Sequence, residues 1–226
     1  TITRAEIVTA LAHLVHQVLV KADPERYNLD RILRANEKNF EHTKEIVQLF
    51  LARFNPELGA GERDITARAT VVRERIENEV DLESARRILL TQVDAVLAVL
   101  RTNVFVERRY ALALRIDPSI LRTEDRDELP FGAFFVHGRG FNGFHVRFRD
   151  IARGGVRAVR TIGHDQHARE LERLYDEVYG LAFAQQMKNK DIPEGGSKSV
   201  VLLQRRATVE RSVQAFVDAL LDLITP

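Results

Sequence analysis

Apolar residues in the first hundred positions recur at the three- and four-residue spacing of amphipathic helices. Thr3 and Glu6 form a capping-box pattern ahead of the first apolar stripe, and Asp23-Pro24 ends it. Nothing in this region indicates chemistry, so the pattern predicts a helical scaffold over residues 1–103. The further helices are expected within residues 29–40, 42–54, 65–80 and 81–100.

From residue 104 onwards the apolar positions alternate, as they do in half-buried strands. This second region also contains two long stretches with helical spacing. We therefore expect an α/β fold, in which the helical region is followed by a mixed α/β sheet domain over residues 104–226. The expected strands are 110–116, 133–137, 144–149 and 200–203, and the expected helices are 165–189 and 208–224.

The spelling Gly138-x-Gly140-x-x-Gly143 matches a dinucleotide-binding fingerprint. That fingerprint needs a strand before it and a helix after it. Here Phe144, Val146 and Phe148 alternate, so a second strand follows the glycines. We interpret the glycines as a hairpin turn and expect neither a Rossmann domain nor a cofactor-binding residue in this chain.

Composition narrows the possible partners. The formal net charge of the 226 residues is +1, so no overall basic field favours nucleic acid or a membrane surface. No apolar run has membrane-spanning length, and no signal-peptide pattern is present. The chain has no cysteine, which fits the reducing cytoplasm. It begins without Met and stops directly after a helical pattern, so we expect a fragment of a longer protein.

Two lysines flank a glycine pair near the end of helix 165–189. The inward stripe of that helix continues onto Gln185 and Lys188, and Lys198 follows Pro193-Glu194-Gly195-Gly196-Ser197, which we expect to form a turn. Glycines allow a ligand to approach bare backbone, and two ammonium groups can hold a dianionic substrate. Lys190 lies about 200° around the helix from Lys188 and is the alternative to it.

A second candidate block is Arg153-Gly154-Gly155, which follows the hairpin. A guanidinium beside paired glycines offers a planar donor fork and free backbone N–H groups, which suit a carboxylate. His164 and His167 have a spacing that metal ligands can use, but no third ligand accompanies them, so no metal site is expected.

Residues 144–157 and 186–198 together resemble a known enzyme family. Over residues 100–226 the chain is similar to the substrate-binding (dimerisation) part of the glutamate/leucine/phenylalanine/valine dehydrogenase superfamily. It most resembles the large NAD-dependent glutamate dehydrogenases.

The resemblance implies roles for the residues already singled out. Arg153 stands where the small enzymes of the family have a carboxylate-binding lysine, and Gln185 with Lys188 matches the pair that holds the substrate α-carboxylate. Lys198 matches the catalytic lysine. The glycines of both blocks, Gly154, Gly155, Gly195 and Gly196, are then expected to contact substrate.

The implied reaction is oxidative deamination of glutamate to 2-oxoglutarate and ammonia. Hydride passes from Cα of glutamate to NAD, and water, helped by Lys198, attacks the resulting iminium. The family's proton-transferring aspartate and NAD-binding domain lie beyond a helix like 208–224, so we expect the chain alone to be inactive. The amino-acid substrate and NAD against NADP remain open.

The resemblance also implies a homo-oligomer, at least a dimer, with residues 110–116 as the sheet edge that pairs between subunits. The alternative from another class is a non-catalytic oligomerisation or regulatory module with the same fold. Binding of glutamate or 2-oxoglutarate distinguishes the two hypotheses.

Overall fold

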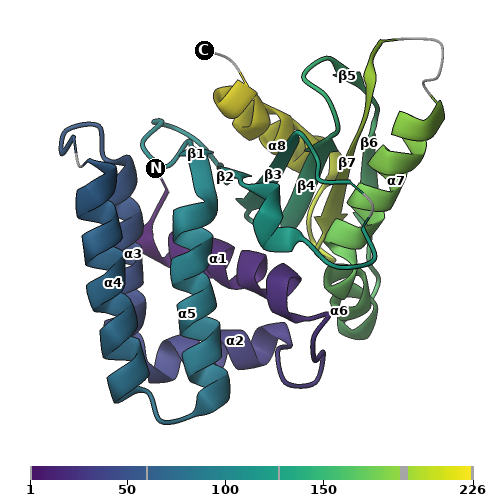
Figure 1. Cartoon of the computed structure of the whole chain (residues 1–226). Helices are drawn as coiled ribbons and strands as arrows, with labels where there is room; N and C mark the ends of the chain where they lie inside the picture. The colour runs from purple at the N-terminus through teal and green to yellow at the C-terminus, as the bar shows by residue number, and fades with distance from the viewer. Residues whose placement is uncertain (1, 60, 127, 189–192, 225–226) are drawn as a thin grey trace. The chain divides into compact units, whose positions relative to one another are not determined.

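The computed structural model describes residues 2–59, 61–126, 128–188 and 193–224. The chain forms two compact units, Ile2–Val99 and Leu100–Pro226, whereas the sequence pattern placed the change at residue 104. The fold is α/β, with helices first and a mixed, open sheet afterwards (Figure 1). Among the described residues, no helix combines the length and the apolar character needed to cross a bilayer.

The first unit is helical, as its apolar spacing predicted. The capping box is present, because Glu6 N–H donates to Thr3 Oγ1 at 3.2 Å and Thr3 N–H donates to Glu6 Oε2 at 2.7 Å. The helices are α1 (Arg4–Leu19), α2 (Leu29–Lys38), α3 (Phe40–Phe54), α4 (Glu62–Glu79) and α5 (Glu83–Ala98).

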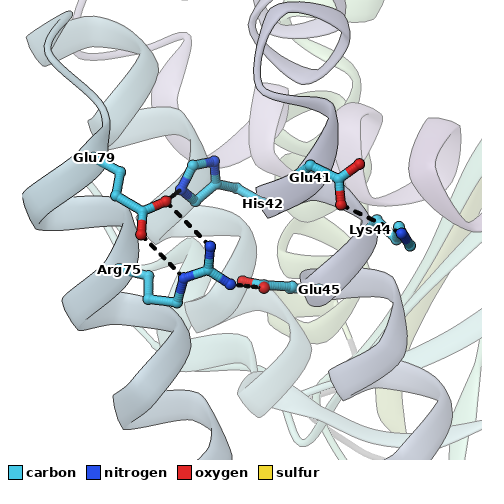
Figure 2. Close-up of polar contacts among 6 residues, drawn as sticks. All are labelled: Glu41, His42, Lys44, Glu45, Arg75 and Glu79. Carbon is cyan, nitrogen blue, oxygen red and sulfur yellow. Dashed lines mark hydrogen bonds and ion pairs between the residues drawn. The ribbon is translucent and has the colours of Figure 1, made fainter.

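Charged side chains fasten α3 to α4 (Figure 2). The Arg75 guanidinium forms ion pairs with Glu79, at 3.1 Å, and with Glu45 of α3. Glu79 also lies 3.1 Å from His42 Nε2. The hydrogen bond from Arg75 is the main reason that the pKa of Glu79 is lowered. These ion pairs form a structural contact between the two helices.

The second unit is built on a seven-stranded sheet with the order β1-β2-β3-β4-β7, and both β5 and β6 pair in parallel with the far side of β7. A short 3₁₀ helix, η1 (Pro118–Leu121), follows β2. The strands are β1 (Val99–Thr102), β2 (Ala111–Ile116), β3 (Gly132–Gly138), β4 (Phe141–Arg147), β5 (Ala152–Arg153), β6 (Val156–Arg160) and β7 (Gly195–Leu203).

The two faces of this sheet carry different helices (Figure 1). On one face α8 (Val209–Ile224) inserts Phe216 over Gly143, where a Cβ atom would lie 2.7 Å from the Phe216 ring. Side chains alternate along β4, so the neighbouring Phe144 lies on the opposite face. There its ring packs 5.2 Å from that of Tyr175 in α7 (Leu174–Lys188). The sheet therefore has a covered layer on each face.

Two predictions for residues 165–203 are wrong. The single helix expected over 165–189 is broken at Arg173 into α6 (His164–Glu172) and α7, and residue 189 lies outside the described part of the chain. The glycine pair after Glu194 is not a turn, because Gly195 and Gly196 begin β7. The buried residues of α7 include Val178 and Ala182.

The expected intersubunit edge is also wrong, because β2 lies inside the sheet between β1 and β3. Buried Asn103 occupies its outer edge: the side chain bonds Ala113 N–H at 2.8 Å and the Ala111 carbonyl at 3.1 Å. The Asn103 side chain also donates to Asp222 of α8, which forms a two-point ion pair with Arg109. This network closes β2 and ties it to α8.

Candidate functional site

Strand β7, which carries Lys198, has backbone partners on both sides. Lys198 lies opposite Val146 of the antiparallel β4, and β5 and β6 lie on the other side. A Cβ atom at Gly196 would point at α7, and side chains two positions apart share a face. Lys198 therefore projects from the α7 face of the sheet.

One hydrogen bond joins the end of α7 to the start of β7. Gly196 N–H donates to Gln186 Oε1 at 2.7 Å. The backbones are in close contact, since a Cβ atom at Gly196 would lie 2.1 Å from Gln186 N and 2.3 Å from the Ala182 carbonyl oxygen. The contact sets the start of β7, two residues before Lys198, against the last turn of α7, which ends at Lys188.

Gly155 is the glycine with open space beside the candidate catalytic lysine. A Cβ atom at Gly155 would lie 3.8 Å from Lys198 Nζ, and no other heavy atom would be that close. A Cβ atom at Gly154 would lie 1.7 Å from the Ser197 carbonyl oxygen, and one at Gly195 would lie 2.7 Å from Arg149 Cβ. At Gly154, Gly195 and Gly196, other protein atoms thus fill the space that a side chain would need. Of these four glycines, Gly155 is the one whose backbone is open.

The other predicted residues are more exposed. Arg153 pairs in register with Gly196, and its guanidinium lies 3.5 Å from the Glu194 carboxylate, with both side chains partly in solvent. Gln185 is half-buried, and Lys188 is exposed at the end of α7. Lys190, the alternative to Lys188, lies outside the described residues. The structure thus brings Arg153 on β5 and Gly155, between β5 and β6, beside Lys198 on β7, and it places Lys188 at the end of the helix that packs on β7.

Sequence reasoning missed two residues on the other face of the sheet, one on β4 and one on β7. His145 Nδ1 lies 2.9 Å from Ser199 Oγ, and these residues pair directly across β4 and β7. Desolvation by burial, with a smaller contribution from the charge of Arg147, lowers the pKa of His145 to about 4. The imidazole is therefore neutral near pH 7. A histidine between Phe144 and Val146, both buried, was the available signal.

Gln186 was also missed, because the resemblance directed attention to Gln185. The available signal was the helical spacing: Gln186 follows Ala182 by four residues, and Ala182 follows Val178 by four. The stripe that faces β7 therefore ends on Gln186.

The glycine fingerprint forms a hairpin, as predicted. Gly138 pairs with Phe141 at the end of the β3–β4 ladder, and Gly140 has a φ of +84° in the turn. No helix follows these glycines, so they do not form a dinucleotide site. His167 lies beside Thr161, 3.1 Å from its hydroxyl, and no group of three metal-ligating side chains occurs in the described part of the chain.

Lysine and arginine side chains beside glycine backbone define a protein with a candidate anion-binding site on a mixed sheet. Residues 71–224 match the family described as "Bacterial NAD-glutamate dehydrogenase, catalytic domain". Because this match covers more than half of the 226 residues, the chain belongs to that family.

Individual relatives agree with the family match. The chain is 40% identical over 157 residues to glutamate dehydrogenase 2 of Dictyostelium discoideum, an alignment that covers 69% of this chain. It is 46% identical over 133 residues, 56% of this chain, to the NAD-specific glutamate dehydrogenase of Saccharomyces cerevisiae. The enzyme of that name from Halomonas elongata is 32% identical over 198 residues, 81% of this chain. The alignments span 15%, 12% and 12% of these relatives, respectively.

Proposed function

We propose that this chain contributes the substrate-binding part of an NAD-dependent glutamate dehydrogenase, which deaminates glutamate to 2-oxoglutarate and ammonia. The family match and the names of the relatives support the reaction. The chain spans a small share of those relatives, so the complete reaction also requires parts of the enzyme outside this chain.

The observation that carries the proposal is the Gln186–Gly196 hydrogen bond, with the close backbone contact around it. It fixes the helix that ends at Lys188 against the strand that carries Lys198. This contact lies at the end of α7 that carries Lys188, so it sets how closely that end approaches the strand of Lys198. With it, a ligand with two carboxylates can contact both elements at once.

In this proposal each basic group has a distinct task. Lys188, with Gln185, binds the α-carboxylate of glutamate, and Arg153 binds the other carboxylate through its guanidinium fork. Glu194, which is ion-paired with Arg153, must give way to that carboxylate. Lys198, beside the open backbone of Gly155, contacts the reacting end of the substrate, where its ammonium group can stabilise negative charge and transfer a proton at Nζ.

The described residues do not fit NAD at the one glycine fingerprint of the sequence, which is a hairpin. We therefore place the NAD site elsewhere in the enzyme and derive no step through it. The proposed tasks of this chain are to bind the dicarboxylate, orient it and supply Lys198.

A non-catalytic module with the same fold is the second candidate, and the Arg153–Glu194 ion pair favours it, because that pair already neutralises one of the substrate-binding cations. Under either candidate we propose a homo-oligomer of at least two copies. Its contacts must use a surface other than β2, because β1 and Asn103 close that strand.

Calorimetric titration of the chain with 2-oxoglutarate tests the proposal. We expect millimolar or tighter binding, and a loss of about tenfold or more in affinity for both Lys198→Ala and Lys188→Ala. Lys44→Ala is the matched control, because Lys44 is a partly exposed lysine of the helical unit, paired with Glu41. Equal affinities in all four proteins would contradict the assigned roles, and no binding by the wild type would favour the non-catalytic module.

A further inference from the structure

A cavity of about 600 Å³ lies at the end of β7 that is farther from Lys198. It forms where the β3–β4 hairpin, the β7–α8 loop and the first turns of α8 meet. Three arginines line it, Arg139, Arg206 and Arg211, and we call it the arginine pocket. Leu203, the last residue of β7, is five positions after Lys198, about 17 Å along the strand at ~3.3 Å per residue. The pocket is therefore separate from the candidate substrate site.

Backbone contacts set the pocket's shape. Gln204 N–H donates to the Gly140 carbonyl at 2.8 Å, which joins the hairpin turn to the loop after β7. Gly140 adopts a φ of +84°, and a Cβ atom there would lie 3.3 Å from Ala207 Cβ. Arg139 and Arg206 flank these joined residues and are brought to one cavity although 67 positions separate them (206 − 139).

The pocket has excess positive charge. Arg206 and Arg211 make no ion pair with any described residue, and Asp218 is the one acidic side chain among the lining residues. The formal charges of three guanidinium groups and one carboxylate sum to +2 in the lining. Arg206 and Arg211 are like charges and repel each other, and a bound anion relieves that repulsion.

A hydroxyl also lines the pocket. Ser212, on the first turns of α8, is 5% exposed, and its side chain makes no hydrogen bond within the described residues. Its hydroxyl can donate a hydrogen bond to an anion held by the arginines.

We propose that the arginine pocket binds a small phosphate-bearing anion. All three cations are arginines, whose planar forks match phosphate oxygens in a two-point geometry that lysine does not provide. The volume falls within the range of small-molecule sites, about 300–1,000 Å³, and exceeds what a lone phosphate fills. Tyr110, 79% exposed at the rim, offers a flat surface for an organic group attached to the phosphate.

Calorimetric titration of the chain with pyrophosphate, at low salt and at physiological salt, tests this assignment. We expect saturable binding at both salt concentrations. The double variant Arg206→Gln/Arg211→Gln should lose about tenfold or more in affinity, and Ser212→Ala should lose less. Both arginine side chains are on exposed residues, so the melting temperature of the double variant should match that of the wild type.

The controls separate a built pocket from general attraction and from the substrate site. Arg205→Gln removes an exposed arginine that does not line the pocket, so it should keep full affinity. Lys198→Ala should also keep it. Equal losses in Arg205→Gln and the double variant, loss in Lys198→Ala, or tighter binding of succinate than of pyrophosphate would each overturn the proposal. Absence of pyrophosphate binding by the wild type would overturn it as well, and none of these outcomes depends on whether 2-oxoglutarate binds.

Discussion

Replacing Gly196 by alanine should separate the two elements that position the candidate lysines. The new Cβ would lie 2.1 Å from Gln186 N and 2.3 Å from the Ala182 carbonyl oxygen, both backbone atoms of α7. Relief requires α7 and β7 to move apart by about 1 Å, which costs about 1–3 kcal/mol as overpacking. The Gln186–Gly196 hydrogen bond, worth roughly 1 kcal/mol, is weakened as well. We therefore expect Gly196→Ala to lower the free energy of unfolding by about 2–4 kcal/mol.

Gly180→Ala is the matched control, because Gly180 lies within α7 but its Cβ would meet no atom within 4 Å. Alanine is the better helix former, so this variant should gain about 0.5–1 kcal/mol. Urea unfolding followed by tyrosine near-ultraviolet circular dichroism measures both, since Tyr110, Tyr175 and Tyr179, three of the four tyrosines, lie in the sheet unit. A Gly196→Ala variant within about 0.5 kcal/mol of the wild type would refute the reasoning.

Three further predictions concern neighbouring groups. Burial lowers the pKa of His145 to about 4 from its usual 6.5. Between pH 4 and pH 6.5, His145 therefore binds a proton in the unfolded chain but not in the folded chain. His145 should thus lower the free energy of unfolding by about 2 kcal/mol from pH 7.5 to pH 5, in addition to the contribution of His16, whose pKa burial also lowers to about 4. His145→Gln should reduce the fall by about 2 kcal/mol in urea titrations. Desolvation raises the pKa of Asp222, but hydrogen bonds from Arg109 and Asn103 outweigh this effect and leave the pKa lowered. The ionised carboxylate therefore stabilises the fold near neutral pH, and this stabilisation is lost in acid. Asp222→Asn should cost about 1–2 kcal/mol near pH 7 and progressively less as the pH falls through the lowered pKa of Asp222; a cost that does not change with pH would contradict this. If the proposed function holds, Gln186→Leu should weaken 2-oxoglutarate binding severalfold in calorimetry and Gln186→Glu, which keeps an acceptor oxygen, should not; equal affinities would show that the bond does not position the lysines.

Elements with a local signal were predictable from the sequence. The helices of the first unit, the β3–β4 hairpin and α8 each have a repeating apolar pattern, and all occur close to the expected positions. The elements that were missed lack such a signal. Strands β5 and β6 contain three arginines among their seven residues and are held by pairing with β7, a contact more than forty positions away along the chain.

The candidate site was predictable in its residue types but not in its geometry. Lys198, Gly155 and Arg153 do occupy β7 and the chain beside it. The glycine pair in the sequence did not distinguish a turn from a strand in close contact with a helix, because glycine is favoured in both, where a Cβ atom would not fit. The sequence likewise did not show which of the adjacent glutamines faces β7. The hydrogen bond with Gly196 identifies Gln186 as that residue.

Lys198 is carried by a strand that is hydrogen-bonded along both edges and lies beneath a helix. Such backbone is among the slowest to open in a protein, because several neighbours must release it together. The backbone of Lys198 is therefore held in place, and the ammonium group can move only by rotation within its own side chain. If catalysis requires a cleft to shut, other parts of the enzyme must travel towards this lysine.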